Sequence, residues 1–525
     1  MDVELTKTDM AAEEELPETE AMTEQGERPE REDKKSPKGS LLGYVISALS
    51  GILFVLWFSS WTSPIFKGSY GFDSAFFSMV GRAILEGKVM YRDYFDVKGP
   101  VFFFWEAFGQ LLCRDRGGIF ILQSICAGAA GVFLYKLCRL YRLKLKNMIF
   151  VFLAVYFIYA TALWGGNSVE EYCLPLSLAC LYFGLQFVKE IRKSVSIAFF
   201  FGLSFGIMLF SKVTVCAPMA ALVLVVFIKL LLDKRFTEAA LAAALFICGI
   251  IDVAMPVIAY FYSKGALGDM LLCAFGIAFK RGTDYYETFS LKWELNLIIC
   301  YAGMALFIAK LFEKTMEKWV LLSLTVLTFL ALHLGTPFDY YFITALPLTA
   351  YIAILICHDG RRILSGKLEK REMRIAVLSI AVASMGIAFT CAAYAERTMN
   401  KFNEDLEILR DEREYPVYLE NKEVYDQIPE EDKADGLYSL ESGMIFFEVN
   451  QILPTNRYPV NLPYFCELYP PAEREILNVI NNESPKWIVA EKLDDLDNQN
   501  IKMAVYNRYD KYYSNGQEEL WKLRQ

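Results

Sequence analysis

Runs of about twenty apolar residues recur along most of the chain, and they constrain its fold more than any other feature. A helix needs roughly 20 apolar residues to cross a bilayer. Of the 525 residues, 55% are hydrophobic, which is above the roughly 45–50% of soluble domains. The length criterion predicts an all-α polytopic membrane domain over 41–394 with about eleven transmembrane helices. The predicted helices lie at 41–61, 117–137, 148–164, 171–188, 196–211, 213–232, 238–262, 295–309, 319–334, 341–357 and 375–394.

The segment before the first apolar run, residues 1–40, has a different composition. It carries 13 acidic and 6 basic residues, a net charge of 6 − 13 = −7. A Glu-rich segment with few aromatic residues cannot bury enough apolar surface to fold. We therefore expect a disordered acidic tail. The run at 41–61 starts too late and is too long for a signal peptide, so we interpret it as an uncleaved first span.

Lys and Arg residues gather in alternate loops, and their placement predicts the orientation of the chain. Cytoplasmic loops of membrane proteins are enriched in these residues. The basic loops can all be cytoplasmic at once, together with the N-terminus; they lie at 34–38, 139–146, 189–193, 234–235, 310–318 and 361–374. The first loop, 62–116, and the C-terminal region are then extracytoplasmic. We expect a multi-pass protein of the plasma membrane.

The apolar run at 100–113 is a special case. At about fourteen residues it is short for a membrane span. A full crossing there would also place the N-terminal tail and the later basic loops on opposite sides of the membrane. We therefore predict a juxtamembrane or re-entrant helix within the first extracytoplasmic loop.

The C-terminal region, residues 395–525, is polar and charged. Short β-like runs at 437–440, 445–449 and 486–490 stand between helical patterns at 398–412 and 472–481, which predicts a small extracytoplasmic α/β domain. The sequence contains neither a dinucleotide-binding glycine motif nor a phosphate-binding P-loop. It has two His and no Cys-x-x-Cys pair. These absences argue against His-based catalysis and a His-rich metal site, and we expect no nucleic-acid partner.

The first extracytoplasmic loop carries the residues that suit chemistry. Asp73 opens a predicted helix over 74–86, whose apolar residues suit a helix on the membrane surface. The stretch 91–100 then mixes aromatic residues with Arg92, Asp93, Asp96 and Lys98 just before the next apolar helix. Carboxylates and cations held together at a membrane interface suit a site for a phosphorylated amphiphile.

The motifs of this loop resemble those of the GT-C glycosyltransferases. The resemblance lies in the spacing of Asp73, Gly87, Tyr91–Asp93 and Lys98–Pro100. The family includes protein O-mannosyltransferases, the lipid A aminoarabinose transferases and the RgtA/B/C/D-like bacterial enzymes. Many members end in a small extracytoplasmic α/β domain, as this chain is predicted to do.

Two later motifs extend the resemblance. A Lys follows a mid-chain apolar run in Leu209–Lys212, and an aromatic segment at 337–342 leads to Leu346–Pro347. Family members often have His-Tyr in the aromatic segment, where this chain has Asp339 and Tyr340. Any role of that His is therefore not carried over.

The resemblance implies transfer of a sugar from a polyprenyl phosphate or diphosphate donor to an extracytoplasmic glycan, lipid or protein. It implies that Asp73 is a general base or orients the acceptor, that Lys98 and Lys212 hold the leaving phosphate, and that Arg92 assists. Some relatives use a divalent cation and others do not, and no ligand cluster here requires one. Candidate acceptor or accessory residues are Asp93, Asp96, Glu170, Glu171, Asp339 and Tyr340.

Simpler interpretations of the same residues stay open. Asp73 suits a helix N-cap, and Lys98 and Lys212 suit lysines that extend toward the membrane surface. The charges at 92–96 suit local salt bridges, and Glu170 and Glu171 suit solvated loop acids. At the level of function, the alternatives are a transporter or lipid flippase and a non-catalytic partner in envelope polysaccharide assembly.

Overall fold

A computed structural model describes most of the chain after the N-terminal tail. The tail expected at 1–40 lies outside the described residues except for its last two positions. The described residues are 39–66, 70–280, 291–311, 313–333, 338–366, 369–410, 416–441, 443–460 and 462–524.

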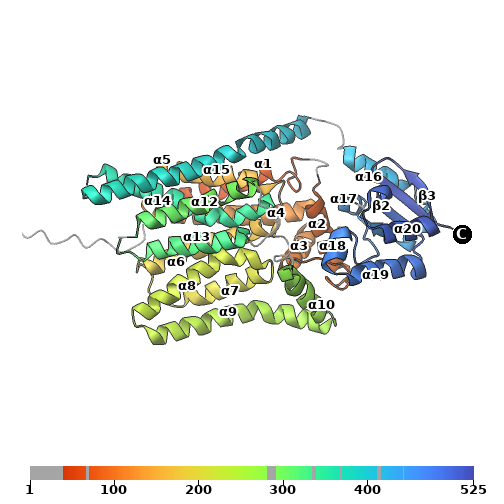
Figure 1. The fold of residues 1–525 in the computed structure, drawn as a ribbon, viewed down its shortest axis with the longest axis horizontal. Coiled ribbons are helices and arrows are strands. Elements are labelled where there is room, and N and C mark those ends of the chain that lie inside the picture. The colour runs from red at the N-terminus through yellow and green to blue at the C-terminus, as the bar shows by residue number, and fades with distance from the viewer. Residues whose placement is uncertain are drawn as a thin grey trace, which may run out of the picture. The chain divides into compact units, whose positions relative to one another are not determined.

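A bundle of long helices forms the first part of the fold (Figure 1). Each of the eleven segments predicted to span the membrane overlaps with one of these helices. Within the described ranges, eight helices are long and apolar enough to cross a bilayer, in two cases together with a preceding 3₁₀ turn. The other three are α7, α12 and α13. The bundle helices are α1 (Leu41–Phe58), α4 (Arg116–Leu140), α5 (Leu145–Leu163), α6 (Val169–Val188), α7 (Ile197–Leu209), α8 (Ala217–Leu232), α9 (Phe236–Ser263), α12 (Leu291–Ala309), α13 (Glu317–His333), α14 (Leu346–Leu364) and α15 (Lys370–Arg410).

Small residues let the bundle helices approach one another closely. Gly51 of α1 faces the backbone of α4 at Ala127, and Gly202 of α7 faces the backbone of α9 at Phe246. A Cβ atom at either glycine would overlap with the partner backbone. Close approach at small residues is a common way for helices to associate in membranes, where burial of apolar surface gives no driving force.

Five of the six loops predicted to be cytoplasmic lie at one end of this bundle, called here the basic end, whereas the sixth, at 34–38, lies outside the described residues. Arg361 after α14 donates to the carbonyl of Tyr141 after α4, at 2.7 Å, and Arg235 before α9 donates to the carbonyl of Lys193 before α7, at 3.1 Å. Lys189 after α6 pairs with Glu317 of α13 at 2.7 Å. The basic loops that alternate along the sequence are therefore also close together in space.

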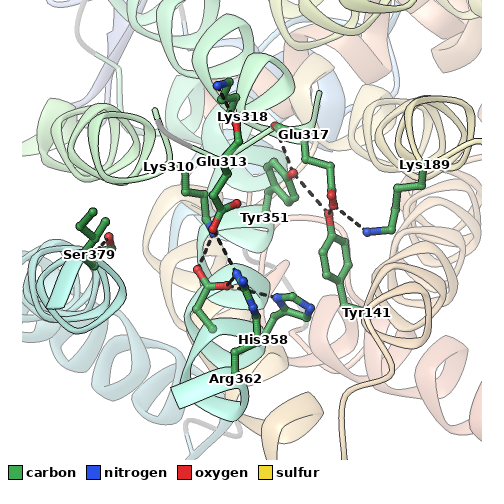
Figure 2. A network of polar contacts seen from close by, with 12 residues as sticks. Tyr141, Lys189, Lys310, Glu313, Glu317, Lys318, Tyr351, His358, Arg362 and Ser379 are labelled. Atoms are coloured by element: carbon green, nitrogen blue, oxygen red, sulfur yellow. Dashed lines mark hydrogen bonds and ion pairs between the residues drawn. The ribbon is translucent and has the colours of Figure 1, made fainter. Parts of the chain in front are cut away.

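A buried polar network holds the helices together at the basic end (Figure 2). Glu317 also accepts a hydrogen bond from the Tyr141 hydroxyl at 2.5 Å. Next to it, Lys310 and Asp359 pair at 2.6 Å, with His358 3.2 Å from the same carboxylate. Because each charge has a partner, the network fixes α4, α6, α13 and α14 relative to one another without an isolated buried charge.

Two shorter helices connect α1 to α4. They are α2 (Phe72–Leu85) and α3 (Pro100–Leu112), and they pack together through aromatic contacts such as Phe77–Phe102, with ring centroids 4.9 Å apart. Thirteen residues make α3 about 20 Å long, which is short of a bilayer core of about 30 Å. The expectation that α2 lies on the membrane surface is incomplete, because Phe76, Phe77 and Val80 are buried within the protein.

The C-terminal domain gathers at the opposite end of the bundle from the basic end (Figure 1). Helix α15 runs on through position 394, where we expected a domain boundary. After it come α16 (Pro416–Asp426), α17 (Met444–Val449), α18 (Leu462–Leu468), α19 (Pro471–Asn478) and α20 (Gln499–Arg508), with strands β1 (Tyr438–Leu440), β2 (Trp487–Glu491), β3 (Tyr509–Ser514) and β4 (Glu518–Leu523).

The strands form one mixed sheet in the order β1-β2-β4-β3, with β1 and β2 parallel and the other pairs antiparallel. The predicted strands at 437–440 and 486–490 are confirmed as β1 and β2. The predicted strand at 445–449 is wrong, because this segment forms helix α17 and buries Phe446, Phe447 and Glu448. The predicted small α/β domain is therefore present, with two strands that were not predicted.

Candidate active site

The segments that carry Lys98 and Lys212 lie side by side. The Gly99 amide donates to the Ser211 carbonyl at 2.7 Å, and the Val101 amide donates to the Phe210 carbonyl at 2.9 Å. A Cβ atom at Gly99 would overlap with the Phe210 carbonyl group. Glycine is therefore required here for close backbone approach, and this approach brings together two lysines that are 114 positions apart (212 − 98).

Lys212 is held in place by an acid and by aromatic rings. Its Nζ lies 2.5 Å from Oε1 of Glu170, which stands in the first turn of α6 and has a side chain only 1% exposed. The same Nζ lies 3.2 Å from the centroid of the Tyr341 ring. This arrangement differs from a lysine extended toward the membrane surface, because the ammonium group points into the protein.

Lys98 has a similar environment. Its Nζ lies 3.7 Å from Asp96 Oδ2 and 4.4 Å from the centroid of the Phe77 ring. Asp96 is buried and also accepts a hydrogen bond from the Lys98 amide at 2.7 Å. Asp96 therefore fixes both the backbone and the ammonium group of Lys98.

Asp73 lies in the first turn of α2 and is not its N-cap, which is Gly71. The side chain is partly exposed. It borders a narrow recess with a cavity volume of about 20 Å³, which is roughly the room that one water molecule needs. Three other residues expected at the site, Lys98, Glu170 and Tyr340, line the same recess as Asp73. The full lining consists of Trp61, Asp73, Phe77, Lys98, Leu163, Trp164, Gly166, Asn167, Ser168, Val169, Glu170 and Tyr340.

One wall of the recess is a loop with an unusual backbone. Trp164, Gly165, Gly166 and Asn167 all have positive φ angles, of 46°, 93°, 96° and 64°. Such a conformation is rare for residues with a side chain, and it costs about 1–2 kcal/mol for each of them. Runs of this kind occur where the surrounding structure holds them, often at functional sites. Sequence reasoning missed this loop, although the Gly-Gly pair was a readable signal.

A capping box follows this loop and holds it. The Ser168 amide donates to Glu171 Oε2 at 2.7 Å, as the pattern Ser-x-x-Glu at a helix start predicts. The side-chain amide of Gln123 also donates a hydrogen bond to Oε2 of Glu171, at 3.3 Å. Glu171 is therefore buried behind the recess, whereas its neighbour Glu170 lines it.

A further buried acid, Glu106 of α3, was not predicted. It is 0% exposed, and its Oε2 accepts from Nδ2 of Asn167 at 3.4 Å. Asn167 also contacts Ser74 Oγ at 3.2 Å, next to Asp73, and accepts from the Tyr172 hydroxyl at 2.7 Å. Asn167 thus joins the loop wall of the recess to the first turn of α2.

Arg92 and Asp93 do not line the recess. Arg92 pairs with Asp93 at 3.0 Å and donates to the Lys264 carbonyl at 3.1 Å. Burial by itself would raise the pKa of Asp93, but hydrogen bonds from Arg92 and from the Val89 amide outweigh it and lower this pKa. The two residues therefore form the local salt bridge that was one of the open interpretations.

The aromatic residues of the same motif dock the C-terminal domain. The Tyr94 hydroxyl donates to the Pro454 carbonyl at 2.9 Å, and the Phe95 amide donates to the Arg457 carbonyl at 2.8 Å. Arg457 in turn donates to the Tyr91 carbonyl at 2.9 Å. Much of the stretch that suggested a phosphate site by its composition therefore forms an interface within the chain.

The side chains of Asp339 and Tyr340 have different environments. Asp339 forms an ion pair with Arg397 of α15. Tyr340 lines the recess and stacks on Trp164, with ring centroids 6.4 Å apart. In the parts of the chain that the structure describes, no group of three or more His, Cys, Asp or Glu side chains is arranged to hold a metal ion.

Comparison with models of known protein families and with curated protein sequences gave no match. The similar solved structures include two of ArnT from Cupriavidus metallidurans, a lipid A aminoarabinose transferase of the GT-C type. The structure bound to undecaprenyl phosphate has a TM-score of 0.54 and 13% identity, and the alignment covers 92% of this chain and 98% of that one.

The apo structure of the same protein gives a TM-score of 0.53, 14% identity and coverage of 91% and 98%. At this identity the likeness concerns the fold. The predicted fold class is confirmed: a mostly helical membrane protein with an ArnT-like GT-C fold and a small C-terminal sheet.

Proposed function

We propose that this protein is a membrane glycosyltransferase that moves a sugar from a polyprenyl-phosphate-linked donor to an acceptor on the extracytoplasmic side. The observation that carries the proposal is the convergence of Asp73, Lys98 and the Lys212–Glu170 pair at one recess. The ArnT-like fold over more than nine-tenths of the chain supports it, because one of the similar structures holds undecaprenyl phosphate.

The proposed reaction is a displacement at the anomeric carbon of the donor sugar. Asp73 takes the proton of the acceptor hydroxyl while that oxygen attacks the anomeric carbon. The bond from this carbon to the phosphate oxygen breaks, and the phosphate leaves with the electron pair. General-base help of this kind is worth roughly 10²–10⁴-fold in rate.

Lys98 and Lys212 stabilise the leaving phosphate in this proposal. Negative charge grows on the phosphate as the bond breaks, and preorganised cations lower the energy of that state. Asp96 and Glu170 hold the two ammonium groups before the donor arrives, so little reorganisation is needed. Arg92, which lies in a salt bridge outside the recess lining, has no role in this mechanism.

The substitution Asp73→Asn tests the proposed base. Asn keeps the size of the side chain but cannot accept the proton, so we expect turnover to fall by roughly 10²–10⁴-fold with no change in the amount of folded protein. The assay is sugar transfer by purified protein in detergent, without a membrane gradient, which also separates an enzyme from a transporter.

Asp115→Asn is the matched control. Asp115 is an exposed acid outside the recess lining, and Asn keeps the size of its side chain. Activity of Asp73→Asn within a factor of a few of wild type would show that Asp73 is not the base.

A further inference from the structure

A groove at the surface of the bundle lies apart from the recess. Its floor is α6, with Pro175, Ala179 and Phe183, and its walls are α4 and α7. About 1060 Å³ of space is not filled by atoms there, and the exposed part of its lining is mostly apolar. Ile125 on the α4 wall is 58% exposed, so the groove opens toward the surroundings of the helices.

Two cations mark the end of this groove nearest the basic end. Lys136 of α4 holds its Nζ 4.6 Å from the centroid of the Phe133 ring. The guanidinium of Arg192, after α6, lies 5.0 Å from the Phe183 ring. Phe133 and Phe183 both line the groove, and their ring centroids are 6.0 Å apart. The Arg192 amide donates to the Gln186 carbonyl at 3.2 Å, which turns the loop back over α6.

Several cations near the groove have an acid partner. Lys189, Lys229 and Arg235 pair with Glu317, Asp233 and Glu238. Within the described ranges, neither Lys136 nor Arg192 forms an ion pair, and each rests on an aromatic ring of the groove. Cations at the end of an apolar groove between helices match the chemistry of a lipid with an anionic headgroup.

We infer that this groove binds an anionic phospholipid from the leaflet at the basic end, with its phosphate at Lys136 and Arg192 and an acyl chain along α6. The inference does not depend on the proposed transfer reaction. Charge complementarity selects an anionic headgroup over a zwitterionic one, and the apolar floor accepts the chain.

The geometry separates this lipid from the proposed sugar donor. Glu170 and the recess stand at the first turn of α6, whereas Arg192 follows its last turn. Twenty residues of helix span about 30 Å. One phosphate cannot occupy both ends, and an isoprenoid tail reaching from the recess carries no charge for Lys136 and Arg192. The lipid in the groove is therefore a separate molecule.

The test uses purified, delipidated full-length protein in detergent, titrated with phosphatidylglycerol or phosphatidylcholine. Native mass spectrometry counts the bound lipids, and thermal unfolding gives the shift in Tm. We expect wild type to prefer phosphatidylglycerol, and Lys136→Gln/Arg192→Gln to bind it about 30-fold more weakly, since each of the two cations near a lipid headgroup contributes about 1 kcal/mol. Ala179→Trp, which fills the groove and keeps both charges, is expected to release the phospholipid as well.

Lys144→Gln/Lys146→Gln is the matched control, because it removes two exposed cations from the same end. An equal loss of binding in this control would show that only the general positive field of that end attracts lipid, and would overturn the inference. Equal binding of both phospholipids by wild type would overturn it too. So would tighter binding of undecaprenyl phosphate than of phosphatidylglycerol at Lys136 and Arg192, since the groove would then belong to a polyprenyl phosphate.

Discussion

At the scale of single residues, sequence patterns predicted several polar groups that line the recess but not the partners of these groups. Asp73, Lys98, Glu170 and Tyr340 were all predicted, and they line one recess. Composition could not separate Glu170 from Glu171, because neighbours on a helix point in different directions. The Ser168–Glu171 capping box decides the matter: Glu171 turns back to the helix start, and Glu170 is left for Lys212.

Gly99 gives a residue-scale prediction about the two lysines. In Gly99→Ala the new methyl group would meet the Phe210 carbonyl, so the Lys98 segment must move away from the Lys212 segment. Misplacement of about 1 Å can cost a factor of roughly 10² in rate. We expect a loss of that order in kcat/KM for transfer, with folded protein still obtained.

The control for this glycine is Gly268→Ala. Gly268 has open space where a Cβ would lie, and alanine favours a helix more than glycine does. Its activity is expected to match that of wild type. An unchanged kcat/KM in Gly99→Ala would mean that the close approach of the two segments does not matter for the reaction.

At the scale of helices and strands, periodicity predicted the bundle well and the C-terminal domain only in part. Apolar runs locate helices reliably because the bilayer requires both length and hydrophobicity. The segment 445–449 is a short run of mostly β-branched and aromatic residues, yet it packs as α17 against α2. Tertiary contacts decide the structure of such short apolar runs.

The missed strands are β3, at the edge of the sheet, and β4, between β2 and β3. Both are rich in polar and charged residues, so they lack a clear apolar alternation. Only Tyr509 of β3 is fully buried. The Asn515–Gly516 pair between them was the available signal, since Asn-Gly is a strong hairpin turn sequence, and Gly516 has a φ of 91°.

A buried polar network joins α2, which carries Asp73, to α17 of the C-terminal domain. Glu448 has a side chain 1% exposed and pairs with Arg82 of α2 at 3.4 Å. It also accepts from the Ser78 hydroxyl at 2.9 Å. Burial raises the pKa of Glu448 although Arg82 and Ser78 act against that rise. The C-terminal domain therefore braces the helix that bears the proposed base.

We predict that Glu448→Ala destabilises the protein by about 3–5 kcal/mol, because it leaves the Arg82 guanidinium buried without its acid. The measurement is thermal or denaturant unfolding in detergent, with Asp497→Ala, an exposed acid of the same domain, as the control. In a double-mutant cycle the loss in Arg82→Ala/Glu448→Ala should be clearly smaller than the sum of the two single losses. Additive losses would mean that the two side chains are not coupled.

At the scale of the whole molecule, the basic loops and the recess stand at opposite ends of the same helices. Glu170 stands in the first turn of helix α6, and the helix ends beside Lys189, which joins the network at the basic end. The alternation of charged loops could be read from sequence because each crossing reverses the side. The docking of the C-terminal domain on the first loop could not be predicted from sequence, because it depends on hydrogen bonds to backbone carbonyls such as those of Pro454 and Tyr91.

The expected orientation gives a testable prediction. In a background without cysteine, Gln517→Cys in the C-terminal domain and Lys144→Cys at the basic end both place a thiol at an exposed position. If the positive-inside rule applies, a membrane-impermeant reagent added to intact cells should modify position 517 and spare position 144. After the membrane is opened, both should react. Modification of position 144 but not of position 517 in intact cells would show that the orientation is opposite to the predicted one.

The proposed mechanism depends on a lipid-linked sugar donor, and a comparison of two donors tests this dependence. Purified protein is given the same sugar either as a polyprenyl phospho-sugar or as a nucleotide sugar, with a panel of extracytoplasmic acceptors. We expect transfer from the lipid-linked donor alone, because Lys98 and Lys212 flank apolar helices and the sequence holds no nucleotide-binding motif. Efficient transfer from the water-soluble nucleotide sugar, with no lipid carrier present, would contradict it.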